Sequence, residues 1–493
     1  MESLIAQINF QSVYAEIVIA FVAIILLMLQ ALFPNKSKNI FGYLSLLGIF
    51  IAALCISFDF QNVMDSVCTK SYSFSGMWVI DNYSRFFKLL FLLCTGLTIL
   101  ISIKYVKEED INHGEYFTLI LFSTLGMMIM ASGSNFVTIF LGIELMSICL
   151  YALAGIKRER LICNEASLKY FLLGSFATGF LLYGMALFYG AIGSTNLNTI
   201  AKTCITGNFQ NPTILIGTLL LFIGFAFKIA AVPFHMWTPD VYQGSPSPIT
   251  GFMSAGPKAA AFAALVRIFL ESLPSLRSDW SDMIWIIAVL TMSLGNFAAL
   301  VQNNVKRMLA YSSIAHVGYI LVAFLSSGTI GISSILYYLL AYTFMNLGAF
   351  AIITVVGGKG EEKTNIEDFV GFGYSNPLTA ITMSLFLFSL AGIPPTAGFM
   401  GKFYIFTAAI KEGFLGIAII GVINSVVSVY YYLRITIAMY MKENTNTLSN
   451  KSTIKFNPAV VIAIIVSVYG VLRMGLFPSD YIEMAQRSLI ALQ

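Results

Sequence analysis

Three lysines and one glutamate lie inside long apolar stretches, where charged side chains are rare. Lys228, Lys258 and Lys402 lie in LLLFIGFAFKIAAVPF, GFMSAGPKAAAFAALV and AGIPPTAGFMGKFYIF, and Glu144 lies in FVTIFLGIELMSICLYAL. A charge at the centre of a bilayer costs roughly 2.5–3.5 kcal/mol on insertion scales. Because lysine and glutamate bind and release protons, their placement predicts a path for charge across or along a membrane.

Three further ionisable residues each have two interpretations. His316, in AYSSIAHVGYILV, is either a hydrogen-bonded core residue or a relay between lysines, since histidine titrates near physiological pH. His235 follows Pro233 within an apolar stretch, and the same two interpretations apply. Lys169 follows Glu165 by one helical turn and could form an ion pair or a proton inlet.

The composition defines the class of protein. Hydrophobic residues make up 58% of the 493 residues and charged residues 11%, whereas a soluble domain has about 25% charged residues. This indicates an integral membrane protein. The net charge of +4 is small and no basic tract indicates nucleic acid. Six scattered cysteines and three histidines show no metal-ligand spacing, so we expect no metal or cofactor in this chain.

A spanning helix needs roughly 20 predominantly apolar residues. We therefore predict an all-α polytopic membrane protein with about fourteen transmembrane helices, forming a single transmembrane domain over residues 1–493. The predicted spans are 13–33, 40–58, 83–103, 116–131, 135–155, 166–190, 213–238, 246–270, 283–302, 308–327, 332–356, 378–409, 413–441 and 457–478.

The loop charges predict an orientation. Odd-numbered connections hold most of the loop lysines and arginines, for example Lys157, Arg158 and Arg160 in the fifth. Because cytoplasmic loops are enriched in these residues, we expect the odd connections in the cytoplasm and both termini on the outer side.

Two spans combine a proline with a lysine in their middle. Pro233 follows Lys228 in the seventh span, and Pro394 and Pro395 precede Lys402 in the twelfth. Broken helices at corresponding places in two inverted halves are typical of a transporter's ion site. Since the two spans are five apart and run in opposite directions, we predict two inverted five-helix repeats, at about 116–270 and 283–441.

Glu144 is expected to pair with one of the buried lysines. A lone buried carboxylate would be protonated and inert, whereas an opposite charge nearby stabilises its ionised form. If Glu144 pairs with Lys228, separating the pair would make the lysine's proton labile and would act as a switch.

Three segments resemble the proton-pumping, antiporter-like membrane subunits of respiratory complex I, the NADH–quinone oxidoreductase. They are GFAFKIAAVPFHMWTPDVYQGSPSPITGFMSAGPKAAA (224–261), VKRMLAYSSIAHVGYI (305–320) and DFVGFGYSNPLTAITMSLFLFSLAGIPPTAGFMGKFYIF (368–406). The resemblance extends through most of the chain. It implies proton translocation coupled to electron transfer from NADH to quinone in other subunits. The alternative is a subunit of a related multisubunit Na⁺/H⁺ antiporter.

The resemblance also implies roles for individual residues. Glu144 matches the fifth-helix glutamate that pairs with the seventh-helix lysine, Lys228. Lys258 and His316 match the central relay, and Lys402 matches the terminal lysine near the exit side.

Cofactors and partners follow from the same resemblance. Lys169 matches a sixth-helix lysine of this family. FMN, iron–sulfur clusters and quinone are expected in other subunits. The expected partners are the antiporter-like subunit M, the small subunit K, the lateral helix of subunit L, the lipid bilayer and protons. The expected location is the bacterial plasma (inner) membrane.

Overall fold

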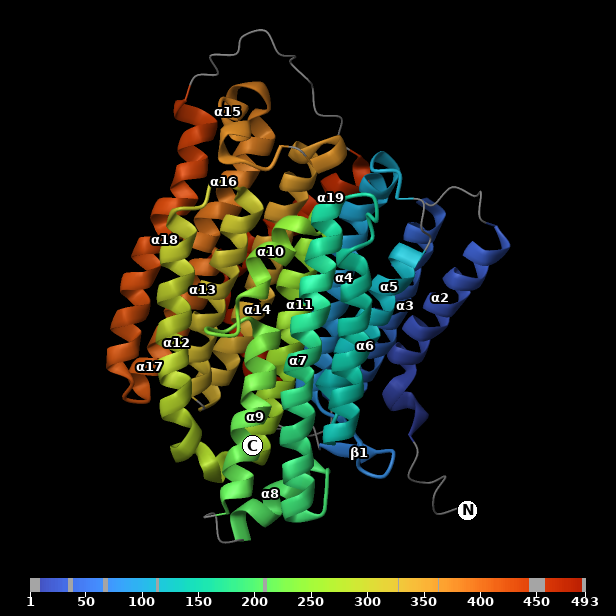
Figure 1. Ribbon diagram of the computed structural model, residues 1–493, viewed down its shortest axis with the longest axis vertical. Coiled ribbons are helices and arrows are strands. Elements are labelled where there is room, and N and C mark those ends of the chain that lie inside the picture. Colours follow the sequence, from blue (N-terminus) through green and yellow to red (C-terminus); the bar gives the residue numbers. More distant parts are fainter. Residues whose placement is uncertain are drawn as a thin grey trace.

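A computed structural model describes residues 9–33, 39–64, 70–111, 115–206, 211–326, 328–361, 363–442 and 457–489. Within these residues, thirteen helical segments are long and apolar enough to cross a membrane. Most of the helices run side by side along the long axis of the molecule (Figure 1). The predicted fold class, an all-α polytopic membrane protein, is confirmed.

The N-terminal part contains one element that the sequence did not predict. A two-stranded antiparallel hairpin, in which Ser73 pairs with Trp78, lies between the second and third long helices. Each strand has only three residues, too few for an alternating pattern to be recognised. The elements of this part are η1 (Phe10–Val13), α2 (Tyr14–Leu32), α3 (Asn39–Met64), β1 (Ser71–Ser73), β2 (Trp78–Ile80), α4 (Asn82–Glu108) and α5 (Glu115–Ser132).

The next part of the chain carries Glu144, Lys228 and Lys258. The helix Ser247–Val266, α11, continues into a π-helical turn, in which each backbone hydrogen bond spans one residue more than in an α-helix. The elements are α6 (Phe136–Ala154), α7 (Leu161–Ile192), α8 (Leu197–Thr206), α9 (Pro212–Ile229), α10 (Trp237–Gly244), α11 (Ser247–Val266), η2 (Arg267–Ser272) and η3 (Pro274–Leu276).

The remaining elements carry His316 and Lys402. The predicted span at 378–409 is divided between two shorter helices, α16 and α17, and so is not among the thirteen long ones. The elements are α12 (Arg277–Leu300), α13 (Val305–Leu325), α14 (Thr329–Gly357), η4 (Lys359–Glu361), η5 (Ile366–Phe369), α15 (Phe372–Ser375), α16 (Pro377–Ala391), α17 (Ala397–Lys411), α18 (Leu415–Met441), α19 (Pro458–Leu476) and α20 (Pro478–Arg487).

The core of the molecule is built from helices that are apolar on nearly all sides. Most residues of α4, α11, α13 and α14 are buried within the chain, and α11 packs against both α4 and α14. A helix that is hydrophobic all round belongs in the interior. By contrast, α2, α7, α12 and α18 bury only one side and present their apolar side chains outward.

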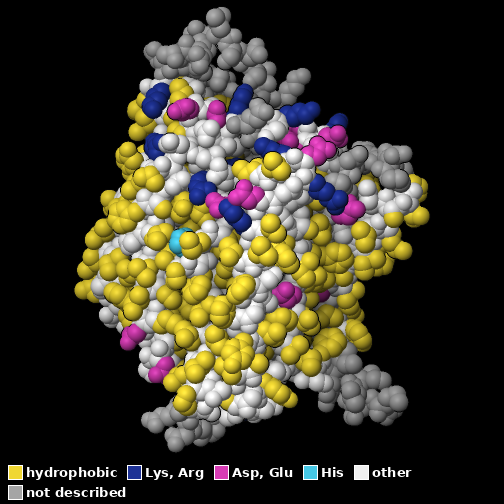
Figure 2. All heavy atoms as spheres, viewed as in Figure 1, with side chains coloured by type: hydrophobic (Ala, Val, Ile, Leu, Met, Phe, Trp, Pro, Cys, Tyr) yellow, Lys and Arg dark blue, Asp and Glu magenta, His cyan; other side chains and the backbone are white. Residues whose placement is uncertain are grey.

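The outer surface agrees with a membrane environment. On the face seen in Figure 2, hydrophobic side chains cover the middle of the molecule, and lysines and arginines gather toward the end where α15 lies. Lipid-facing helices expose apolar side chains because the bilayer interior offers no hydrogen-bond partners.

Two isolated antiparallel bridges join asparagines at the starts of two helices. Asn135 pairs with Asn196 before α6, and Asn304 pairs with Asn365 before α13. Each leading asparagine also caps its helix, because its side chain accepts a backbone N–H of the first turn. Asn304 follows Asn135 by the same number of residues as Asn365 follows Asn196.

The chain leaves the helical conformation twice within apolar stretches, between α9 and α10 and between α16 and α17. In both places the residue after the first helix has a positive φ, 62° at Ala230 and 90° at Gly392. Pro233 and Pro395 follow these two residues by the same spacing. The two interruptions therefore have the same local layout in the sequence and in the backbone.

Candidate functional site

Lys228 is positioned by the end of α9. It lies in the last turn of this helix, where the negative end of the helix dipole favours a cation. The side chain is 6% exposed, and its Nζ donates a hydrogen bond to the Oγ of Ser147 on α6 at 2.8 Å. The ring of Tyr151, one turn further along α6, lies 6.0 Å from the ammonium.

Glu144 lies one turn before Ser147 on α6 but does not contact Lys228. Within the described residues, Glu144 and Lys228 form no ion pair, and Glu144 instead accepts a hydrogen bond from Thr178 at 2.9 Å. The carboxylate is close enough for its charge to act on Lys228. Ser147 therefore occupies the position of direct partner that the sequence assigned to Glu144, because it is one turn nearer to the end of α9.

Lys258 lies in the middle of α11 and is 3% exposed. Its ammonium contacts the hydroxyl of Ser313 on α13 and lies 3.3 Å from the carbonyl oxygen of the same residue. The ring of Tyr242 lies 5.8 Å away. The burial of α11 on all sides explains why Lys258 reaches no solvent.

His316 follows Ser313 by three residues and so lies on the same face of α13. Its Nδ1 is 2.6 Å from the hydroxyl of Tyr338 on α14, and its Nε2 is 3.0 Å from the hydroxyl of Tyr432 on α18. Tyr432 also contacts the hydroxyl of Ser312. A neutral imidazole has one donor and one acceptor nitrogen, so His316 can pass a proton between two hydroxyl groups.

Lys402 lies on α17, after the second interruption, and is 4% exposed. Its Nζ donates to the carbonyl oxygens of Leu390 and Ala391 at 3.0 and 2.8 Å, and to the hydroxyl of Ser425 at 3.0 Å. The ring of Tyr319 lies 5.0 Å from the ammonium.

Three of the predicted residues lie in one buried region. Lys258 and Lys402 are both close enough to His316 for their charges to act on it. Each of the three contacts at least one serine or tyrosine hydroxyl, and all three side chains are at most 4% exposed.

An aromatic series connects the surroundings of Lys228 with those of Lys258. Tyr151 is 4.7 Å from Tyr170, which stacks on Trp237 at 4.5 Å, and Trp237 is 6.1 Å from Tyr242, the ring beside Lys258. The distances are between ring centroids. The rings of this series pack α6, α7 and α10 against one another.

Several buried tyrosine hydroxyls near Lys228, Lys258 and His316 lack a hydrogen-bond partner among the described residues. Those of Tyr151, Tyr242 and Tyr342 make no hydrogen bond of normal geometry within the described part of the chain. Tyr242 and Tyr342 both approach Ser313.

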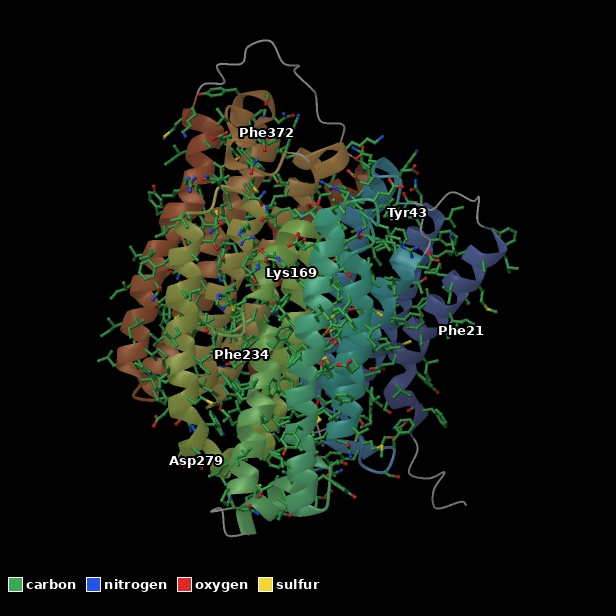
Figure 3. The ribbon with its side chains drawn as sticks, in the orientation of Figure 1. Phe21, Tyr43, Lys169, Phe234, Asp279 and Phe372 are labelled. Atoms are coloured by element: carbon green, nitrogen blue, oxygen red, sulfur yellow. The ribbon has the colours of Figure 1, made fainter. Side chains whose placement is uncertain are left out.

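The two less central candidates lie outside this buried region. Lys169 is 41% exposed on α7 (Figure 3) and forms ion pairs with Glu165 at 2.6 Å and Asp240 at 2.9 Å. Asp240 also binds Arg307 at 2.6 Å, so it connects α7, α10 and α13. His235 is half-buried in the interruption next to Phe234 (Figure 3), and no hydrogen bond among the described residues joins its side chain to the buried lysines.

The two broken helices do not carry their lysines in equivalent places. Lys228 lies before the first interruption and Lys402 lies after the second. With the prolines aligned, Lys402 corresponds to Asp240, and Lys228 corresponds to Leu390. The two lysines therefore lie on opposite sides of the two interruptions, as the order of lysine and proline in the sequence already indicates.

Sequence reasoning missed the hydroxyl partners and a second group of charges. Ser147, Tyr338 and Tyr432 carry no signal in the sequence, because serine and tyrosine are common in membrane helices. Arg267, near a helix end, is 1% exposed and binds the fully buried Asp81 at 3.0 Å.

Across the described ranges, no group of three or more histidine, cysteine, aspartate or glutamate side chains could hold a metal ion. The arrangement can bind and transfer protons, because its groups are amines, an imidazole and hydroxyls.

Comparisons with known proteins agree on a family. A family model described as NADH:quinone oxidoreductase/Mrp antiporter, TM matches residues 133–428. NADH-quinone oxidoreductase subunit N from Trichlorobacter lovleyi is 50% identical over 483 residues, 98% of this chain and 97% of that protein. Subunit N 1 from Solibacter usitatus is 42% identical over 478 residues, 96% of each chain.

Solved structures show the same fold. A chain of respiratory complex I from Thermus thermophilus has a TM-score of 0.79 and 32% identity, and covers 95% of this chain and 98% of its own. A chain of the membrane-bound sulfane sulfur reductase, an archaeal respiratory membrane complex, has a TM-score of 0.85, 27% identity and 98% coverage of each chain. A chain of the Mrp complex from Dietzia sp. DQ12-45-1b is 20% identical with a TM-score of 0.84, which shows the fold alone.

The chain belongs to the antiporter-like membrane subunits of the NADH–quinone oxidoreductase family. The helix array and the buried lysines are in keeping with this assignment. Within the family it groups with subunit N, the name that both relatives above carry.

Proposed function

We propose that this chain translocates protons across the bacterial inner membrane as a subunit of NADH–quinone oxidoreductase. Protons would pass from the Glu144–Lys228 region through Lys258 and His316 to Lys402. The observation that carries the proposal is the burial of Lys258, His316 and Lys402 in one region, each in contact with a hydroxyl group. Intramembrane ionisable residues facing the interior mark proton relays.

The first step depends on Glu144 and Ser147. Ser147 holds the ammonium of Lys228 directly, and the charge of Glu144 supports it from nearby. A movement of α6 relative to α9 would change this support and make the proton labile. Moving one charge against about 200 mV requires about 4.6 kcal/mol. A hydrogen bond to a charged group contributes only about 1.5–3 kcal/mol, so loss of the Ser147 contact would supply part of this energy and a change in the support from Glu144 would have to supply the rest.

The neighbouring subunits would supply this movement, because we expect the redox groups in those subunits. We expect electron transfer from NADH to quinone, with FMN and iron–sulfur clusters, in those other subunits. Glu144 is partly exposed on α6, so a neighbouring subunit would complete its environment.

The proposed partners are subunits M and K and the lateral helix of subunit L. Pro233 and Phe234, in the first interruption, line a shallow apolar groove together with Phe176 and Trp237. Lipid-exposed irregular backbone does not occur in the hydrocarbon region, so a protein segment is expected to cover this groove.

The equal spacing of the two asparagine bridges and of the two interruptions supports two inverted repeats, at about 116–270 and 283–441. The gathering of lysines and arginines at one end of Figure 2 supports the predicted orientation, with both termini on the outer side.

The relay is tested with Lys228→Ala in the assembled, reconstituted enzyme. We expect the ratio of pumped protons to transferred electrons to fall while the complex still contains all its subunits. Lys88→Met is the control, because Lys88 is also a buried lysine but lies away from the relay, where it forms an ion pair with Glu16 at 2.7 Å. An unchanged proton-to-electron ratio in Lys228→Ala would exclude the proposed relay.

A further inference from the structure

The ammonium group of Lys402 is surrounded by oxygen atoms from two helices. Leu390 and Ala391 contribute their carbonyl oxygens from α16, and Ser425 contributes its hydroxyl from α18, all within 3.0 Å. An ammonium has three N–H donors, so each donor has one oxygen acceptor. The side chain thus fills a site that matches its charge and its hydrogen-bonding capacity.

The position of these oxygens follows from the end of α16. The last four carbonyls of a helix lack an intrahelical partner and carry the negative end of the helix dipole. The chain turns away at Gly392, which has a φ of 90°. A Cβ at Gly392 would lie 3.1 Å from the Cδ of Lys402, so glycine lets the backbone approach the lysine closely.

The same set of ligands suits a free monovalent cation. Membrane transporters coordinate small cations with carbonyl oxygens at the C-terminal ends of broken helices. Carbonyl oxygens also replace the hydration shell of K⁺ in ion channels. The face of Tyr319, 5.0 Å from the ammonium, adds a cation–π contribution. A cation of about the size of ammonium, such as K⁺ or Rb⁺, fits this environment.

We propose that these oxygens form a monovalent-cation site, which Lys402 fills with its own ammonium group. Because the lysine is covalently attached, it keeps free cations out of this end of the proton path. This inference rests on the proposed function, since exclusion of other cations matters only where Lys402 belongs to the path. It supplies a structural reason for conducting protons in preference to metal cations.

Lys258 provides an internal comparison. Its ammonium is held by the hydroxyl and the carbonyl oxygen of one residue, Ser313, in the middle of two continuous helices. No helix end faces it within the described contacts. Removal of Lys258 would therefore leave fewer oxygens and no dipole end, and we expect no cation site there.

The test is the binding of radioactive Rb⁺ to the purified, assembled complex. We expect Lys402→Ala to gain one saturable Rb⁺ site per chain that the unmodified complex and Lys258→Ala both lack. Adding Ser425→Ala should weaken this binding at least about tenfold, because a hydroxyl ligand to the charge is lost. Lys402→Met fills the space of the lysine without a charge and should bind no additional Rb⁺.

The outcomes separate this site from the relay. Absence of Rb⁺ binding in Lys402→Ala, or equal binding in Lys258→Ala, would overturn the cation site. If Lys402→Ala does not assemble, Lys402→Ser replaces it, with the same expected and overturning results. Proton pumping is measured on the same preparations. If Lys402→Ala loses pumping but binds no Rb⁺, only the cation site is rejected. If Lys402→Ala pumps normally, the terminal step of the relay is rejected.

Discussion

Replacing Tyr432 by phenylalanine would remove one oxygen atom from the centre of the buried network. In the structure this hydroxyl contacts Ser312 and lies 3.0 Å from the Nε2 of His316. The ring is fully buried, so phenylalanine preserves the packing. The space left by one oxygen atom is smaller than the roughly 30 Å³ that a water molecule occupies in the liquid, so we expect no water to replace it.

The magnitude follows from the two groups that lose their shared partner. A buried polar group without a hydrogen bond costs about 1–3 kcal/mol, so the Ser312 hydroxyl and the His316 imidazole together lose about 2–6 kcal/mol. If the proton passes through this link, its barrier rises by a comparable amount. The transfer would then slow by roughly 30- to 10⁴-fold.

The assay is NADH-driven proton uptake by proteoliposomes containing the assembled enzyme, measured together with electron transfer. We expect Tyr432→Phe to lower the ratio of protons to electrons. Tyr431→Phe is the matched control, because this adjacent tyrosine bonds to Asn296 at 3.0 Å instead of to His316. The reasoning is refuted if Tyr432→Phe keeps the normal ratio, or if both variants lower it equally.

Two further substitutions test other contacts of the structure. Ser147→Ala removes the hydrogen bond to Lys228, which contributes about 1.5–3 kcal/mol for a charged donor, and should lower the proton-to-electron ratio. Ser147→Thr retains the hydroxyl and should keep the normal ratio, so equal pumping by both variants would contradict this role. Arg267→Met leaves the buried Asp81 unpaired and should destabilise the protein by about 3–5 kcal/mol in thermal unfolding. Adding Asp81→Leu should restore most of that loss, and a double variant no more stable than the single one would argue against the pairing.

Much of the fold could be predicted from the chain because membrane helices have a simple physical signature. Every backbone group must be satisfied internally within lipid, so long apolar runs become helices. The boundary between α9 and α10 was harder, since the span predicted at 213–238 continues through the interruption while the helix ends at Ile229. The β1–β2 hairpin was missed, because three-residue strands have no detectable period.

Part of the candidate site could also be predicted from the sequence, and part could not. Lys228, Lys258 and Lys402 are recognisable because a charge within an apolar run is costly and therefore rare. Their partners are not recognisable, since Ser147, Ser313 and Tyr432 do not differ in kind from other serines and tyrosines. The contact between Lys228 and Ser147, in place of the expected ion pair with Glu144, depends on how α6 meets the end of α9.

The sequence by itself determined that this is a polytopic helical membrane protein with ionisable residues inside its apolar segments. These facts follow from hydrophobicity and charge, which act on each segment locally. Only the tertiary structure decided that α11, α13 and α14 form the core and that His316 lies between two tyrosine hydroxyls. It also placed the ammonium of Lys402 at the end of α16, because such contacts join residues far apart in the chain and depend on how the helices pack.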